Sequence, residues 1–282
     1  MEKIGLLIDS TTLTREEIAN YPFVKVAPLG VTIDGIDYIE PDLSTEDMKK
    51  YLHTAKKMTT SQPSPGKFLK LYQEYFNEGY THVLVVTLSE KLSGTYQSAM
   101  IAKTMVDFDL EISVHSAKIA SFGVALGVNL LSQMIEEGTT FLKLTARYQA
   151  LFNNTVLMFT LADLMHLFRG GRLSKVQALL GTVLRIKPIV EMIEGKLQLT
   201  KKERTNIACY DYFMTFIKDF YEKYDHVYVD IIHMNRIEWA EKMKNEINEK
   251  YPKIQLHLTD YVSPVFFVHL GDQGFGIAIV AE

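Results

Sequence analysis

The chain has 282 residues, 47% of them hydrophobic and 23% charged, with a formal net charge of −4. This length and composition suit a globular protein built from two domains or from one large α/β unit. No dense block of Lys or Arg is present, which disfavours a nucleic-acid-binding protein. The single cysteine, Cys209, excludes an internal disulfide and most cysteine-rich metal sites.

Nothing in the sequence predicts export, a membrane span or a metal centre. The first residues, Met1-Glu2-Lys3-Ile4, lead directly into a strand pattern and not into a signal peptide. No apolar run is long enough to span a bilayer, and the histidines show no metal-ligand spacing. We therefore expect a cytoplasmic protein that is not integral to a membrane and that holds no metal or cofactor.

Strand and helix patterns alternate through the first half of the chain. Short apolar runs predict buried strands at Ile4–Ile8, Val83–Val86 and Ile112–Val114. Helices are predicted from about Thr14, through Leu52, after Ser64, over Thr95–Val106 and over Phe122–Ile135. This alternation predicts right-handed βαβ units and a mostly parallel sheet with helices on both faces.

Local signals mark several boundaries of these elements. Asp34-Gly35 is a hairpin turn signal after an extended stretch, and Ser44 with Asp47 resembles a capping box. Ser64 is a good N-cap with Pro65 at the first helical position.

In a parallel sheet, ligands bind beyond the carboxyl ends of the strands. Polar residues follow three of the predicted strands, at Asp9-Ser10-Thr11, Leu88–Thr95 and His115-Ser116. We expect these segments to converge on one edge of the sheet.

The second half of the chain begins near residue 154. Strands are predicted at Val156–Leu161, Ile186–Ile193, Lys196–Thr200, Val227–Ile232, Ile254–Leu258 and Gly276–Val280. Helices are predicted at Ala162–Phe168, Val176–Leu184, Thr205–Tyr224 and Glu238–Lys250. We expect two α/β domains, residues 1–154 with a mostly parallel sheet and residues 155–282 with a mixed sheet, and a ligand between them.

Two hydroxyl-rich segments each precede a predicted helix, Thr59–Pro65 and Leu92–Ala99. A helix N-terminus has free N–H groups and a partial positive charge, so added hydroxyls there can bind a small anion. Helix capping is the alternative role for each segment alone. The pair Thr60 and Ser93 is the candidate head-group site.

Two further segments carry polar chemistry. His269 lies beside glycines that would let its imidazole approach a ligand closely, although a lone histidine in an apolar run is more often a core residue. Arg169-Gly170-Gly171-Arg172 is not a P-loop. Its two arginines suit a partner's carboxylate or phosphate, or they belong to a solvated loop.

Two enzymatic or ligand-binding alternatives remain open at this point. Ser93 with His269 as its base would make a serine-dependent esterase or acyl transferase, but no G-x-S-x-G elbow surrounds Ser93. The same helix N-termini could bind a nucleotide or phosphate, although no glycine-rich phosphate loop is present.

The order of the motifs resembles that of the DegV family over essentially the whole chain. The motifs are Asp9-Ser10-Thr11, Thr60-Ser61-Gln62-Pro63-Ser64, Leu92-Ser93-Gly94-Thr95, Arg169-Gly170-Gly171-Arg172, Ile186-Lys187-Pro188-Ile189 and Glu203-Arg204-Thr205. The resemblance implies two α/β domains enclosing a fatty acid. It also implies a non-catalytic partner of a bacterial fatty acid kinase, which phosphorylates the bound carboxylate to an acyl phosphate.

The resemblance also implies roles for individual residues. Thr60, Ser93 and His269 match the positions that contact the carboxylate. The positions that could complete the pocket are Ser61, Gly94, Thr95 and Phe267. Arg172, together with Arg169, is expected to dock the kinase from a surface loop without affecting lipid binding.

One segment departs from the family pattern. Phe267 stands where the family commonly has glycine, and Val268 stands where it has threonine. We expect the Phe267 ring to shorten or redirect the acyl tunnel, and Phe267→Gly to widen ligand preference.

Overall fold

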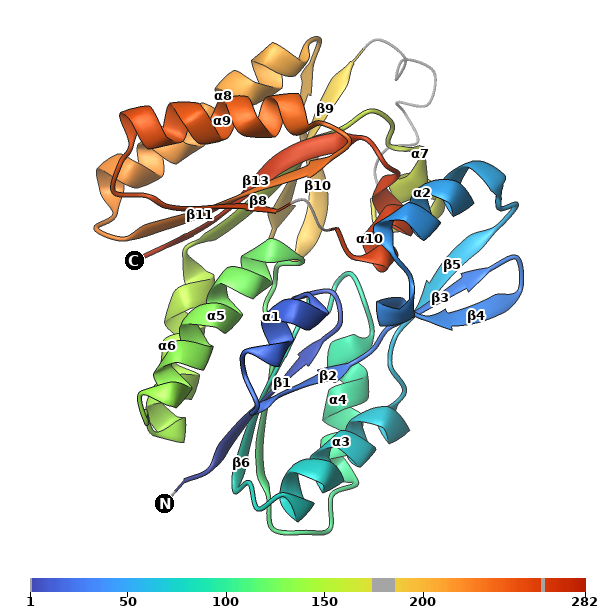
Figure 1. Cartoon of the computed structure of the whole chain (residues 1–282), viewed down its shortest axis with the longest axis vertical. Helices are drawn as coiled ribbons and strands as arrows, with labels where there is room; N and C mark the ends of the chain where they lie inside the picture. The colour runs from blue at the N-terminus through green and yellow to red at the C-terminus, as the bar shows by residue number, and fades with distance from the viewer. Residues whose placement is uncertain (1, 174–185, 260–261) are drawn as a thin grey trace.

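The computed structural model describes residues 2–173, 186–259 and 262–282, and its strands form three sheets (Figure 1). The mixed α/β class is as predicted. The helix expected over Val176–Leu184 lies outside the described residues. Within the part of the chain that the structure describes, no helix combines the length and apolar character needed to cross a bilayer.

The first sheet is entirely parallel and has the strand order β2-β1-β6-β7. Its strands are β1 (Ile4–Asp9), β2 (Val24–Ala27), β6 (His82–Thr87) and β7 (Glu111–Ser116). Successive side chains point to opposite faces of a strand, so both faces of this apolar sheet need a cover. Leu7, Val83 and Val85 share a cluster with Phe68 and Tyr72 on one face, whereas Ile8 and Val86 contribute to the core on the other.

Helices cover both faces of the parallel sheet, as predicted. Apart from the two that accompany the small sheet described next, the described helices of this half are α1 (Arg15–Ala19), α3 (Pro65–Asn77), α4 (Thr95–Thr104), α5 (Phe122–Glu136) and α6 (Phe141–Asn153). Ser64 caps α3 by accepting from the Lys67 N–H, with Pro65 in the first turn. Helix α6 was not predicted from the sequence.

A small antiparallel sheet stands beside the parallel sheet, with the strand order β4-β3-β5. Its strands are β3 (Gly30–Ile33), β4 (Ile36–Ile39) and β5 (Met58–Ser61). The short helix η1 (Glu40–Asp42) and helix α2 (Thr45–Thr54) lie between β4 and β5 in the sequence. The predicted hairpin turn is confirmed, since Asp34 and Gly35 both have positive φ, 49° and 90°. The capping box of Ser44 and Asp47 at the start of α2 is also confirmed. Strand β5 was not predicted.

The third sheet is mixed and has the order β10-β9-β8-β13-β11-β12. Its strands are β8 (Thr155–Leu161), β9 (Lys187–Ile193), β10 (Lys196–Glu203), β11 (Val227–Met234), β12 (Gln255–Thr259) and β13 (Gly274–Ala281). Only the β11–β12 pair is parallel. Helices α8 (Asn206–Lys223) and α9 (Ile237–Lys250) cover the outer face of the mixed sheet. Helices α5 and α6 pack on its other face, which is turned toward the parallel sheet (Figure 1).

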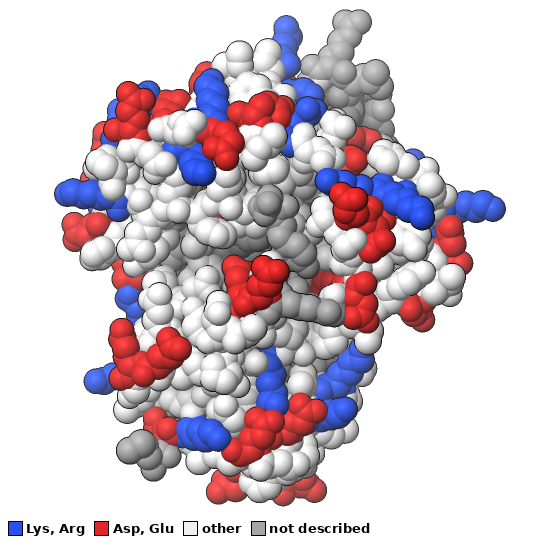
Figure 2. Space-filling view, viewed as in Figure 1, with Lys and Arg blue, Asp and Glu red and all other residues white. Residues whose placement is uncertain are grey.

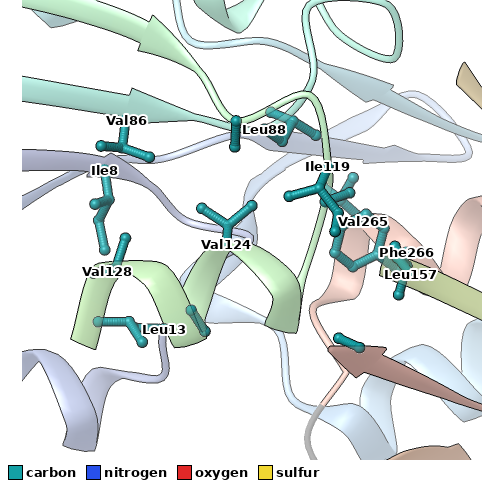
Figure 3. Packing of buried hydrophobic residues seen from close by; sticks show 14 of the residues in the cluster. Ile8, Leu13, Val86, Leu88, Ile119, Val124, Val128, Leu157, Val265 and Phe266 are labelled. Atoms are coloured by element: carbon teal, nitrogen blue, oxygen red, sulfur yellow. The ribbon is translucent and has the colours of Figure 1, made fainter. Parts of the chain in front are cut away.

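One hydrophobic core connects the sheets. Figure 3 shows Ile8 and Val86 of the parallel sheet against Val124 of α5, with Leu157 of β8 and Phe266 nearby. All strands of the parallel sheet precede residue 154 and all strands of the mixed sheet follow it. The division into domains 1–154 and 155–282 nevertheless stays a prediction, because the core is shared.

Helix α10 (Pro264–Leu270) is the clearest case of a late segment packed on early ones. It contacts α2, β3, β5 and η1 of the first half and α7 (Met165–Arg169) of the second. On the face shown in Figure 2, acidic and basic side chains are interspersed, so this face presents no surface of one sign. The position of α10 brings its residues to the polar segments described next.

Candidate functional site

Thr60 lies on strand β5, not at a helix N-terminus as predicted from the sequence. Residues 58–61 pair with β3, with Thr60 opposite Val31, and α3 begins only at Pro65. The backbone of this segment is therefore engaged in a sheet, and the helix dipole of α3 does not act at Thr60. Instead, Thr60 Oγ1 lies at hydrogen-bonding distance, 2.9 Å, from His269 Nε2.

Ser93 does precede a helix, as predicted. Gly94 is the N-cap of α4, and Ser93 Oγ lies 2.9 Å from Thr95 Oγ1. The loop that carries Ser93 is held at the strand ends of the parallel sheet. The Leu88 N–H donates to Asp9 Oδ2 at 2.6 Å.

The predicted convergence of strand ends is confirmed. The Glu90 N–H donates to Ser116 Oγ at 3.1 Å, so the loop after β6 contacts the ends of both β1 and β7. The side chain of His115 does not take part in these contacts. Its Nε2 lies 2.7 Å from Ser113 Oγ, and its ring packs on Tyr148.

His269 lies in the last turn of α10, not in the glycine-bordered loop that the sequence suggested. Burial, then the charge of Arg172 and the proximity of His166, lower its pKa to about 4. The imidazole is therefore neutral at physiological pH. Among the described residues, its Nδ1 has no hydrogen-bond partner, whereas its Nε2 faces Thr60.

The Gly170-Gly171 pair has a steric reason. A Cβ on Gly170 would lie only 2.4 Å from His269 Nδ1, so the imidazole ring occupies the space that a side chain would need. Gly171 has φ of 71° with open space around it, so its requirement is conformational. The first glycine of the motif, Gly170, therefore leaves room for the His269 ring.

Arg172 is not on a solvated loop tip, which corrects the interpretation from the sequence. It is half-buried, and its Nε donates to the Leu92 carbonyl at 3.2 Å while Nη1 donates to the Gly170 carbonyl at 2.6 Å. Arg169, at the end of α7, is exposed as expected. The two arginines therefore occupy different environments.

The polar side chains meet around one cavity of about 800 Å³, including its open mouth. Its polar lining consists of Thr60, Ser61, Gln62, Ser93, Arg172 and His269. A second cavity, of about 570 Å³ and almost entirely apolar, shares Leu92, Leu197, Phe266 and Leu270 with the first.

The remaining predicted pocket residues divide into two groups. Ser61 lines the polar cavity, whereas Gly94, Thr95 and Phe267 are not among the lining residues of either cavity. Phe267 is 2% exposed within the hydrophobic core, so it does not obstruct the cavities. Its neighbour Phe266 lines both of them.

Gln62 was overlooked among the candidate site residues. Its amide packs against Gly94, where a Cβ would lie 2.3 Å from its Oε1, and its Nε2 donates to Ser98 Oγ at 3.3 Å. Its position directly after Thr60 and Ser61, in the same polar motif, indicates that Gln62 belongs to the site.

The geometry does not form a nucleophile–base pair. Ser93 Oγ bonds the Thr95 hydroxyl and His269 Nε2 bonds the Thr60 hydroxyl. A histidine with a pKa of about 4 is also a weak general base at neutral pH. Within the described ranges, no group of three His, Cys, Asp or Glu residues could hold a metal ion. The arrangement instead suits binding of an anionic head group by one cation and several hydrogen-bond donors.

Comparison with protein families gives one match over nearly the whole chain. The model described as "Uncharacterised protein, DegV family" matches residues 3–282. A DegV domain-containing protein of Halalkalibacterium halodurans is 31% identical over 284 residues, covering 100% of both chains. One from Staphylococcus aureus is 29% identical over 287 residues, again covering 100% of both.

Solved structures share the fold. A DegV family protein of Streptococcus agalactiae, described as fatty acid binding, has a TM-score of 0.91 at 27% identity, with 100% of each chain covered. DegV of Bacillus subtilis, also described as a fatty acid binding protein, has a TM-score of 0.89 at 27% identity with the same coverage.

Proposed function

Because the chain belongs to the DegV family, we propose that it binds a long-chain fatty acid and presents the carboxylate to a fatty acid kinase for phosphorylation to an acyl phosphate. The observation that carries the proposal is the pair of adjoining cavities. The apolar one shares four lining residues with the polar one. An amphipathic ligand would place its long tail in the apolar cavity and its small polar head in the polar one. Similar proteins are described as fatty acid binding.

The tail supplies most of the affinity. Burying roughly 14 methylenes, at about 0.8 kcal/mol each, gives a gross contribution of about 11 kcal/mol before the costs of association. A hydrogen bond to a charged group contributes only about 1.5–3 kcal/mol net. The polar residues therefore decide which end of the ligand lies at the mouth.

The head group meets one positive charge and three hydrogen-bonding side chains in this arrangement. Arg172 supplies the charge, and Thr60, Ser93 and His269 supply the hydrogen bonds. Because His269 is neutral, one N–H of its imidazole can donate to a carboxylate oxygen without adding a second cation. One fatty acid per chain is the expected stoichiometry.

The kinase partner is the part of the proposal that rests on the family resemblance. Arg169 is exposed at the end of α7, three residues before the cavity-lining Arg172, and can form bidentate pairs with a partner's carboxylates. The chain itself transfers no phosphoryl group in this scheme and works in the cytoplasm, where ATP is available to the kinase.

Mass spectrometry of an organic extract of the purified protein tests the central claim. We expect a co-purifying fatty acid, and re-binding of a fatty acid to the delipidated protein in calorimetry. Release of no fatty acid together with no binding by calorimetry would contradict the proposal.

Thr60→Val and Ser93→Ala test the head-group assignment. Each removes a hydroxyl, and we expect each to weaken binding by about 10- to 150-fold with the fold intact. Dissociation constants measured by calorimetry, with circular dichroism as a check of folding, give the answer. Unchanged constants in both variants would leave these hydroxyls with local structural roles only.

A further inference from the structure

Glu40 is a buried carboxylate that the sequence did not single out. It begins the short helix η1 between β4 and α2, and it is 1% exposed. Three donors point at it. The hydroxyls of Ser10 and Ser263 donate to its two oxygens, and the Val265 N–H donates to Oε1 at 3.1 Å. These donors come from segments more than 200 residues apart in the chain.

The partners of Glu40 come from two other parts of the molecule. Ser10 follows β1 of the parallel sheet and also accepts from the Leu29 N–H, at 2.9 Å, just before β3. Ser263 and Val265 form the start of α10. The carboxylate therefore joins the parallel sheet, the small sheet and α10 at one buried point.

Helix α10 depends on this contact for its N-terminal cap. Its own N-cap residue, Ser263, makes no capping hydrogen bond within the helix. A free N–H in the first turn of a buried helix needs an acceptor, and Glu40 provides it from another element. Burial raises the pKa of Glu40, while the bonds from Ser10, Ser263 and Val265 oppose that rise.

The other end of α10 carries the head-group site. Phe266, His269 and Leu270 line the polar cavity, and the His269 ring fits between Thr60 and Gly170 with little freedom. At a rise of about 1.5 Å per residue, Val265 and His269 are about one helical turn apart. A shift at the start of α10 is therefore carried to the imidazole.

We propose that Glu40 is a positioning residue of the head-group site, which fixes α10 on the small sheet so that His269 meets Thr60 and the ligand carboxylate. This inference rests on the proposed function, because it assumes a carboxylate at His269. It assigns to Glu40 a larger effect on recognition of the head group than on binding of the apolar tail, which contacts Phe266 and Leu270 of the same helix.

The ratio of two dissociation constants separates head-group recognition from tail binding. Palmitic acid and hexadecanol share a tail but differ in the head group, and both are measured by displacement of a fluorescent fatty acid. For Glu40→Gln, which keeps the side-chain size, we expect the preference for the acid to fall about tenfold, as for loss of one well-formed hydrogen bond to a charged group. The affinity for the alcohol is expected to fall less than that for the acid, so that the ratio of the two constants changes.

Two companion variants make the test decisive. Ser263→Ala removes a single donor, and is expected to lower the same ratio even if Glu40→Gln does not fold. Asp230→Asn is the matched control, because Asp230 is also a buried carboxylate, 2% exposed, but bonds Thr259 in the mixed sheet. We expect it to lower the melting temperature without changing the ratio.

The outcomes distinguish the two proposals. An unchanged ratio in folded Glu40→Gln or Ser263→Ala would overturn the positioning role while leaving fatty acid binding intact. An equal fall in Asp230→Asn would also overturn it, because the effect would then be general destabilisation. A wild-type protein that bound acid and alcohol equally would instead overturn the proposed head-group site.

Discussion

His269 is a neutral residue placed beside a cation, and that combination has consequences for pH. Its pKa, about 4 in the folded protein, lies below the ordinary value of 6.5. The unfolded chain therefore takes up this proton more readily, and the histidine lowers folding stability as the pH falls from about 6.5 to about 4. Above that range it has no such effect.

We predict that fatty acid binding raises the pKa of His269. A carboxylate at hydrogen-bonding distance favours the protonated imidazole and opposes the effects of burial and Arg172. NMR titration of the ring, with and without palmitic acid, measures the shift. Hexadecanol, which carries no charge, is the control and should leave the pKa in place. A pKa that rises equally with both ligands would mean that the carboxylate does not lie at this ring.

Gly170→Ala is predicted to weaken fatty acid binding more than Gly171→Ala. The new methyl at 170 would meet His269 Nδ1 at 2.4 Å, so the ring must move. At 171 nothing lies within 4 Å, and the expected effect is backbone strain of about 1–2 kcal/mol because φ is 71°. Calorimetry and thermal unfolding measure the two effects separately. Equal affinities in the two variants would show that the ring tolerates displacement.

At the scale of elements, α10 divides its two adjacent phenylalanines between different surroundings. Phe266 lines both cavities, whereas Phe267 is packed in the core. We therefore expect Phe266, and not Phe267, to shape the space for the acyl chain.

We predict that Phe266→Ala changes the ranking of fatty acids by chain length, whereas Phe267→Ala mainly destabilises the protein. Removing the lining ring enlarges the ligand space and favours longer or kinked chains. Removing the core ring costs about 3–5 kcal/mol of folding stability. A competition assay across chain lengths and a urea denaturation curve test the pair. A changed ranking in Phe267→Ala alone would restore the original expectation.

The elements that the sequence predicted well are those specified by local chemistry. The capping box at Ser44, the cap at Ser64 and the turn at Asp34-Gly35 depend on neighbours within a few residues, and all three are observed. The alternation of apolar strands and amphipathic helices likewise predicted the parallel sheet and its cover.

The elements that were missed depend on distant partners. Strand β5 has four residues of alternating exposure and exists through its pairing with β3. Helix α10 is rich in aromatic and β-branched residues, which have low helix propensity, and its start is held by Glu40. The contact between Thr60 and His269 joins positions 209 residues apart, and no local pattern indicates it. The Asp9–Leu88 contact was foreseeable, because strand ends of a parallel sheet meet at one edge.

At the scale of the whole molecule, the proposed site lies where the sheets, α7 and α10 meet. The loop after β6 supplies Ser93, the small sheet supplies Thr60 and the segment after α7 supplies Arg172. Charged residues of both signs are scattered over the face shown in Figure 2, so a partner protein that docks on this face must recognise local groups and not a uniform field.

Arg169→Glu and Arg172→Glu are predicted to differ in their effects. Arg172 lines the polar cavity, so its reversal should weaken fatty acid binding; Arg169 is exposed, so its reversal should reduce only acyl-phosphate formation by the cognate kinase. Calorimetry with a fatty acid and a coupled kinase assay measure both. Lys70→Glu is the control, since this exposed side chain lies on α3. Full kinase turnover with Arg169→Glu would exclude this arginine from docking.

Strand β13 has a consequence for biosynthesis. It follows every other described strand in the sequence but lies between β8 and β11, in the middle of the mixed sheet. Until translation has passed residue 281, β8 and β11 each have one unpaired edge, because β13 is not yet made. Such edges can pair with other chains. The parallel sheet, whose strands all precede residue 117, can form while the ribosome is still at work. A prematurely terminated chain would therefore lack β13 and leave the edges of β8 and β11 open to other chains, and chaperones would be needed most at the end of synthesis.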